Sequence, residues 1–176
     1  QAKFFFAQKD VPGVPVEYLL AISGTSTKKD VELDLKIGRV FFAGRTFDEF
    51  EEKKKKKPDF PDQAPMVHQG FHQYVQTAFS IETQAAGDEK PGRKIVDLLL
   101  EQPESRVYLA GHSAGGSAAI LLGARLISMG VKPEQLKIMT FGAPAVGNAA
   151  FAAKYSPDLD LIRVVVPGDP IPGLLK

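Results

Sequence analysis

The chain has 176 residues, of which 44% are hydrophobic, and this size and composition predict one globular domain with a sizeable buried core. Its 22 basic and 21 acidic residues nearly cancel, so the net charge gives no reason to expect nucleic acid as a partner. The absence of cysteine excludes disulfides, thiolate catalysis and cysteine-ligated metals, and leaves the cellular compartment open.

The N-terminal part of the chain predicts strands. Two short runs rich in aromatic and branched residues, Lys3–Ala7 and Val16–Ile22, lie between proline and glycine residues and are typical of strands. Residues 25–37 mix charges with alternating aliphatic residues, and this pattern fits either a strand or a short surface helix. The segment Gly38–Ala43 is short and apolar and fits a further strand.

A helix is predicted over Thr46–Lys56. It opens with a capping box, in which the side chains of Thr46 and Glu49 satisfy free backbone groups of the first turn. Its apolar face consists only of Phe47 and Phe50. The helix is therefore expected to be short and to lie at the surface.

The charged run Glu51–Lys57 allows two interpretations. It could dock on anionic lipid, or it could be the solvated face of the helix. Glu51 with Lys55 and Glu52 with Lys56 are oppositely charged pairs four residues apart, and cations suit a helix C-terminus. These features favour the solvated face.

The middle of the chain predicts two helices. A proline-bearing loop at residues 58–65 leads into Gln69–Thr83, where apolar residues recur at intervals of three and four, as an amphipathic helix requires. A loop around Gly87 and Pro91 precedes a second helix at Lys94–Gln102.

From residue 106 the pattern becomes a regular alternation of strands and helices. The predicted elements are a strand at Arg106–Ala110, a helix at Ala114–Met129, a strand at Leu136–Phe141, a short helix after Asn148 and a strand at Leu161–Val166. The strands are apolar enough to be covered on both faces, which indicates a parallel sheet joined by right-handed crossovers. The fold class is therefore α/β.

A glycine-rich pentapeptide separates the strand from the long helix. Gly111-His112-Ser113-Ala114-Gly115 fits the pattern G-x-S-x-G, in which a serine lies on a strained turn and small residues at Gly111 and Gly115 allow close backbone approach. Ser113 would then lie at a helix N-terminus, where the dipole favours the negative charge of an acyl-transfer intermediate. The alternatives are a phosphate-binding turn or a purely structural one.

Five short blocks occur in a characteristic order along the chain. They are Ser23–Thr27, Val67–Phe71 with Tyr74, Gly111–Gly116, Thr140–Asn148, and Arg163–Val165 followed by Asp169–Pro172. In these blocks the chain resembles the class 3 lipases, the fungal-lipase-like branch of the α/β-hydrolases. The resemblance implies a single domain over residues 1–176 with the α/β-hydrolase fold, a mostly parallel sheet with helices on both faces, and a C-terminal part that this chain lacks.

The resemblance also places a mobile lid in the segment 26–66, which is longer than the family usually has. Four phenylalanines of this segment either face lipid or belong to the ordinary core: Phe41, Phe42, Phe47 and Phe50. The chain departs from the family where Ser23, Val31 and Ala114 replace the usual arginine, tryptophan and leucine. These departures concern lid packing and substrate preference rather than the chemistry.

A serine nucleophile needs donors for the oxyanion that its attack creates. The backbone N–H of Ala114, the residue after Ser113, is the first expected donor. The resemblance points to Thr25 as the second, in a turn that Gly24 permits. The alternative is that Thr25 caps the segment that follows it.

An acid must orient the base, and Asp169 is the best candidate. It comes just after the C-terminal end of the strand predicted at Leu161–Val166, which is the edge of a parallel sheet where Ser113 also emerges. Asp158 and Asp160 precede this strand and should lie at its opposite end.

The base itself is not evident. In this fold the triad follows the order serine, acid, histidine, but His68, His72 and His112 all precede Asp169. We therefore expect the catalytic histidine to lie some tens of residues beyond Lys176. His68 and His72 have the spacing of two zinc ligands, but without a glutamate between them or a third ligand we expect neither a metal nor a cofactor.

These features predict a serine carboxylester hydrolase of the lipase type. The resemblance implies acylglycerols or phospholipids as substrates, a lipid–water interface as a working surface, and a secreted or cell-envelope location. No apolar stretch reaches the roughly 18 residues of a membrane-spanning helix. The alternatives are an inactive lipid- or partner-binding domain that lacks its histidine, and a serine peptidase or thioesterase on the same fold.

Overall fold

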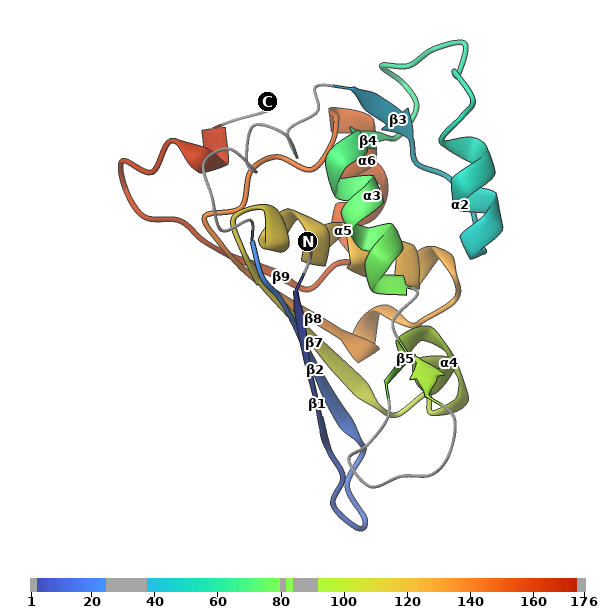
Figure 1. The fold of residues 1–176 in the computed structure, drawn as a ribbon, viewed down its shortest axis with the longest axis vertical. Coiled ribbons are helices and arrows are strands. Elements are labelled where there is room, and N and C mark those ends of the chain that lie inside the picture. Colours follow the sequence, from blue (N-terminus) through green and yellow to red (C-terminus); the bar gives the residue numbers. More distant parts are fainter. Residues whose placement is uncertain (1–2, 25–37, 80–81, 84–91, 174–176) are drawn as a thin grey trace.

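A five-stranded sheet forms the centre of the computed structural model, which describes residues 3–24, 38–79, 82–83 and 92–173 (Figure 1). Its strands, in spatial order, are β1 (Phe4–Lys9), β2 (Glu17–Ile22), β7 (Arg106–His112), β8 (Leu136–Phe141) and β9 (Leu161–Val164). β1 is antiparallel to β2, and every other neighbouring pair is parallel. All five strands were predicted, and the α/β class with a mostly parallel sheet is confirmed.

The helices follow the sequence pattern, with shifted ends. They are α2 (Phe47–Lys53), α3 (Gln69–Phe79), α4 (Ile95–Glu101), α5 (Ala114–Ser128) and α6 (Ala149–Tyr155), with short 3-10 turns at Pro133–Gln135, Ser156–Asp158 and Ile171–Gly173. Two short strand pairs complete the described part: β3 (Arg39–Phe41) with β4 (Met66–His68), and β5 (Glu82–Thr83) with β6 (Arg93–Lys94). α3 was predicted to reach Thr83, but it ends at Phe79 and Thr83 instead pairs with Arg93 in another segment.

One face of the sheet is packed against the helices, and the other is exposed. In β8 the buried side chains Leu136, Ile138 and Thr140 alternate with the exposed side chains Lys137, Met139 and Phe141. The buried face packs on α5, where Gly123 permits a close approach because a Cβ there would lie 2.5 Å from Ile138 Cδ1. The side chains of α2, α4 and α6 join the same core cluster.

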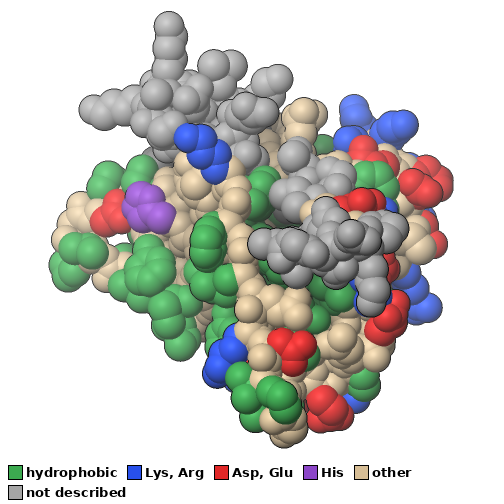
Figure 2. Space-filling view, turned by 60° about the horizontal axis from the view of Figure 1, so that its bottom comes forward, with side chains coloured by type: hydrophobic (Ala, Val, Ile, Leu, Met, Phe, Trp, Pro, Cys, Tyr) green, Lys and Arg blue, Asp and Glu red, His purple; other side chains and the backbone are tan. Residues whose placement is uncertain are grey.

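The exposed face of the sheet is also apolar. Large hydrophobic side chains from all five strands lie on it, namely Phe5, Leu19, Tyr108, Met139, Phe141, Ile162 and Val164. Figure 2 shows hydrophobic side chains gathered on the left of the molecule, the side opposite α2 and α4 in Figure 1. Within the described residues, the helical cover that the strand pattern predicted on both faces is therefore seen on one.

Two of the four phenylalanines of the predicted lid segment belong to the core. Phe42 and Phe50 are fully buried, with ring centroids 4.9 Å apart, and Phe42 also packs edge-on against Phe151 and Tyr155 of α6. Phe47 is 38% exposed, so the predicted apolar face of α2 reduces to Phe50. Residues 25–37 lie outside the described residues, and the lid stays a prediction.

The ends of α2 differ in detail from the predicted capping box and ion pairs. Thr46 Oγ1 accepts a hydrogen bond from Glu49 N at 3.2 Å, but the Glu49 carboxylate accepts from Arg45 N at 2.8 Å rather than from Thr46. The predicted pair of Glu52 with Lys56 forms at 2.7 Å. Glu51 instead pairs with Lys54 at 2.5 Å, and its other carboxylate oxygen is buried near His72.

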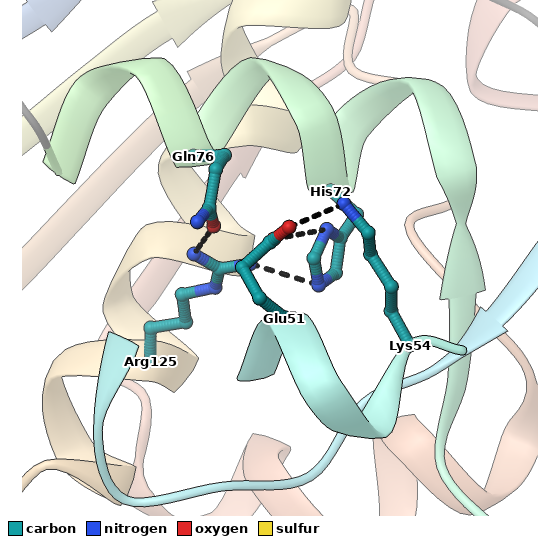
Figure 3. A network of polar contacts seen from close by, with 5 residues as sticks. All are labelled: Glu51, Lys54, His72, Gln76 and Arg125. Atoms are coloured by element: carbon teal, nitrogen blue, oxygen red, sulfur yellow. Dashed lines mark hydrogen bonds and ion pairs between the residues drawn. The ribbon is translucent and has the colours of Figure 1, made fainter. Parts of the chain in front are cut away.

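A buried polar network connects α2, α3 and α5 (Figure 3). Arg125 on α5 is 1% exposed and donates hydrogen bonds to Gln76 Oε1 at 2.6 Å and to His72 Nε2 at 2.9 Å. Because arginine can only donate, His72 Nε2 accepts, and the proton of the neutral ring lies on Nδ1. That nitrogen lies 3.9 Å from Glu51 Oε1, and Glu51 Oε2 in turn accepts from Lys54 at 2.5 Å.

This environment holds His72 in its neutral form. Burial, followed by the nearby charges of Arg125 and Lys54, lowers the pKa of His72 from 6.5 to about 3. In the unfolded chain the ring has its ordinary pKa, so between pH 6.5 and pH 3 the unfolded state binds the extra proton. Acid therefore favours unfolding through this residue.

We expect the free energy of unfolding to fall by about 2 kcal/mol between pH 8 and pH 5 because of His72, since each pH unit below the unfolded pKa contributes about 1.4 kcal/mol. Urea denaturation at the two pH values measures this loss. His72→Gln should show a pH dependence that is smaller by the same amount. An unchanged pH dependence in this variant would mean that His72 can be protonated in the folded protein.

Candidate active site

Ser113 forms the whole connection between β7 and α5. Its backbone angles are φ 53° and ψ −127°, and among the described residues it is the only non-glycine residue with a positive φ. Its N–H donates to Phe141 O at 2.9 Å, and its carbonyl accepts from the N–H groups of Gly116 and Ser117. The side chain is half-buried rather than enclosed. A non-glycine residue in this region is strained and marks a candidate functional site.

The glycines around Ser113 make the strained turn possible. A Cβ on Gly111 would lie 2.3 Å from Gly115 O, and a Cβ on Gly115 would lie 2.3 Å from Ile22 O at the end of β2. A Cβ on Gly24, just after β2, would lie 2.6 Å from His112 O. The end of β2 and the turn around Ser113 are therefore in direct backbone contact.

Replacing Gly111 with alanine should prevent this packing. The new Cβ would meet three backbone atoms of Gly115 and Gly116 within 2.6 Å, and backbone cannot move aside as a flexible side chain can. We expect Gly111→Ala to lower the free energy of unfolding by about 3 kcal/mol, measured by urea denaturation. Gly173→Ala is the matched control, since nothing lies within 4 Å of its new Cβ. Equal stability of the two variants would contradict this packing.

Asp169 lies at the same edge of the sheet as Ser113. Its Oδ1 accepts from Ile171 N at 2.9 Å, which fixes the carboxylate within its own loop. Its Oδ2 lies 2.8 Å from the position that a Cβ on Gly142 would occupy, and Gly142 follows Phe141, whose carbonyl binds Ser113 N. Gly142 has a φ of +55°, a conformation that favours glycine. A side chain there would also collide with the Asp169 carboxylate.

Of the other predicted site residues, the structure describes Ala114 but not Thr25, and it also describes the competing Asp160. Ala114 is the first residue of α5, so its N–H has no partner within the helix. Thr25 lies outside the described residues. Asp160 lies at the opposite end of β9, where its carbonyl accepts from Ile138 N and its carboxylate pairs with Lys137.

Within the described residues, no hydrogen bond joins the Ser113 hydroxyl to any of the three histidines. His68 and His72 are buried. His72 Nε2 accepts a hydrogen bond from the guanidinium of Arg125, so this nitrogen is not available to bind a metal ion. His112 is exposed, and it lines a hollow of about 400 Å³ on the uncovered face of the sheet, together with Phe5, Ala21, Ala110 and Phe141. Among the residues that the structure describes, no group of three possible metal ligands gathers.

Two side chains without a predicted role hold the loop after β8. Ser117 Oγ donates to Pro144 O at 2.9 Å, and Arg163 Nη2 donates to Ala143 O at 2.7 Å. Ser117 directly follows the block Gly111–Gly116, and Arg163 begins the block Arg163–Val165. Their partners are 27 and 20 residues away along the chain, so no local pattern could have revealed these contacts.

Comparison with known protein families identifies the family of this chain. The family described as Lipase (class 3) matches residues 19–176. The chain belongs to this family. The lipase from Rhizopus microsporus var. chinensis has a similar crystal structure, with a TM-score of 0.64 and 26% sequence identity over 99% of this chain and 52% of that one. The expected α/β-hydrolase fold is thereby confirmed.

Curated relatives match shorter parts of the chain. A lipase of Caenorhabditis elegans is 37% identical over 93 residues, which cover 51% of this chain and 26% of that protein. The chloroplastic/mitochondrial phospholipase A1 EG1 of Oryza sativa subsp. indica is 39% identical over 70 residues, or 39% of this chain and 16% of that protein. The chain thus spans about half of the Rhizopus structure and aligns with a smaller share of these curated relatives. In the part of the chain that the structure describes, no helix has the length and apolarity to cross a membrane.

Proposed function

We propose that this class 3 lipase chain hydrolyses carboxylic esters through an acyl-enzyme at Ser113. The observation that supports this most strongly is the conformation of Ser113, a strained non-glycine residue at a strand-to-helix turn and at the N-terminus of a 15-residue helix. Strain of this kind persists only where the surroundings enforce it, and here three glycine contacts and three backbone hydrogen bonds do so.

The proposed reaction has two steps. Ser113 Oγ attacks the ester carbonyl carbon while a histidine base takes the hydroxyl proton, and the resulting oxyanion receives hydrogen bonds from Ala114 N–H and from Thr25. The C–O bond to the alcohol then breaks, and the alcohol leaves with the proton from the base. Water attacks the acyl-enzyme in the same way, which releases the carboxylic acid and restores the Ser113 hydroxyl.

Asp169 is the proposed acid that orients the base and stabilises its charged form. Its position above Gly142, at the edge of the sheet where Ser113 lies, supports this role. Since His68 and His72 are buried and His112 is exposed on the uncovered face, we propose that another histidine acts as the base.

Acylglycerols or phospholipids are the proposed substrates, at a lipid–water interface and without a cofactor. The support is that similar proteins include both a lipase and a phospholipase A1. A panel of ester, thioester and amide substrates would separate this proposal from a thioesterase or a peptidase.

The proposal is tested by labelling the full-length protein with a fluorophosphonate and mapping the adduct by mass spectrometry. We expect a single phosphonylated residue, Ser113, and less labelling in Asp169→Asn. A protein that binds lipid vesicles without ever being labelled would instead be a binding domain, and the apolar hollow beside His112 would be its candidate surface. An adduct on another serine would overturn the assignment of Ser113.

A further inference from the structure

Tyr74 lies on α3 and was given no role above, and its hydroxyl reaches the end of β2. Tyr74 Oη donates a hydrogen bond to Ser23 O at 2.5 Å, across 51 residues of sequence. Its ring packs against Phe4 of β1, with centroids 5.9 Å apart. Tyr74 therefore connects helix α3 to strand β1, through Phe4, and to the end of strand β2, through Ser23.

Ser23 is held at both ends of its backbone. Its N–H donates to Lys3 O at 3.0 Å, and its carbonyl accepts from Tyr74. The carbonyl of Ser23 and the N–H of Gly24 belong to one planar peptide group, so fixing one fixes the orientation of the other. The two hydrogen bonds therefore set the direction in which the chain leaves β2.

This exit from β2 lies directly against the nucleophile. A Cβ on Gly24 would lie 3.4 Å from Ser113 Cβ, and a Cβ on Gly115 would lie 2.7 Å from Ser23 C. A small rotation of the peptide between Ser23 and Gly24 would therefore displace the turn that holds Ser113 and Gly115.

We propose that Tyr74 is a positioning residue, which fixes the Ser23–Gly24 peptide against the turn that carries Ser113, so that the oxyanion donor Ala114 N–H faces the carbonyl attacked by Ser113. The proposal rests on the proposed ester hydrolysis and on the contacts of Ser23, Gly24 and Tyr74. Tyr74 does not touch the reacting atoms. It acts through the backbone on a hydrogen bond that matters most in the transition state.

The test compares Tyr74→Phe with the parent in the full-length protein. The substitution removes the hydroxyl and keeps the ring on Phe4. Removing a whole oxyanion donor costs roughly 100- to 1,000-fold in kcat, so a donor that is only misdirected should cost about tenfold, with KM nearly unchanged. Binding of a trifluoromethyl ketone, which forms a tetrahedral adduct on serine, should weaken by a similar factor.

Tyr108→Phe is the matched control. Its hydroxyl binds Glu17 at 3.0 Å on the exposed face of the sheet, so it loses the same group without affecting Ser23. The melting temperature of both variants shows whether a loss of kcat reflects general destabilisation. Equal kcat values in Tyr74→Phe and Tyr108→Phe would overturn the positioning role.

A second measurement does not depend on turnover. Hydrogen exchange in peptides that contain Ser23 and Gly24 should be faster in Tyr74→Phe than in the parent and in Tyr108→Phe. Unchanged exchange would also overturn the proposal. The proposed hydrolysis fails by a different result, namely ester turnover that persists in Ser113→Ala, so the two failures are distinguishable.

Discussion

Ser113→Ala should lower kcat for a soluble ester such as p-nitrophenyl butyrate by roughly 10³- to 10⁶-fold in the full-length protein, because the attacking oxygen is removed while the oxyanion donors remain. Alanine keeps the Cβ that the turn already accommodates, so the hydrogen bond from residue 113 N to Phe141 O should persist. Initial rates over a range of ester concentrations measure the effect, and urea denaturation should show an unchanged or slightly altered stability.

Ser128→Ala provides the matched control for this variant. Ser128 is the last residue of the same helix, and its hydroxyl donates to Ala124 O at 2.9 Å, far from the strained turn. We expect its kcat to stay within about twofold of the parent. A Ser113→Ala protein that retains the turnover of Ser128→Ala would show that the ester is attacked by another group.

Arg125→Ala should lower the free energy of unfolding by about 3–5 kcal/mol, the cost of removing one partner from a buried charged network. The substitution leaves Gln76 Oε1 and His72 Nε2 without their donor, and it removes the guanidinium that lies 4.7 Å from the centre of the Phe50 ring. For a domain of this size the melting temperature should fall by about 10 °C. Thermal and urea unfolding measure both quantities.

Arg106→Ala is the corresponding control at an exposed arginine, and its stability should change by less than about 0.5 kcal/mol. Arg125→Lys gives a further comparison, because it keeps the charge but cannot make both hydrogen bonds in the same geometry. An Arg125→Ala protein as stable as Arg106→Ala would show that the network in Figure 3 does not hold α2 against α3 and α5.

The expected effects in Ser113 and Arg125 illustrate two different kinds of predictability. The strained serine was identified from five residues, because the turn between a parallel strand and its helix is a local problem that only certain small residues solve. No local pattern predicted a role for Arg125. Its hydrogen-bond partners on α3 lie 49 and 53 residues earlier in the chain, and its guanidinium lies over Phe50 of α2, so only packing shows that it is buried.

The phenylalanines of the predicted lid segment are a second case in which tertiary packing, and not the local pattern, decides burial. The sequence left two alternatives open, a lipid-facing surface or ordinary core, because an apolar side chain has the same local pattern in both. Contact with Phe151 and Tyr155, more than 100 residues away, decides the matter for Phe42. The short strand β4 was missed for a related reason, since three residues carry too little pattern and pair only with a distant segment.

By itself the sequence determined the order of strands and helices from residue 106 onward, the α/β class, the turn at Ser113 and the loop that carries Asp169. These depend on periodicity and on backbone geometry, which act over a few residues. The tertiary structure alone decided that the described helices cover one face of the sheet, that Arg125 and His72 lie in a buried network, and that Tyr74 binds Ser23. Such contacts form between segments far apart in the chain, and their free energy depends on burial and on the partner's position, neither of which a local pattern contains.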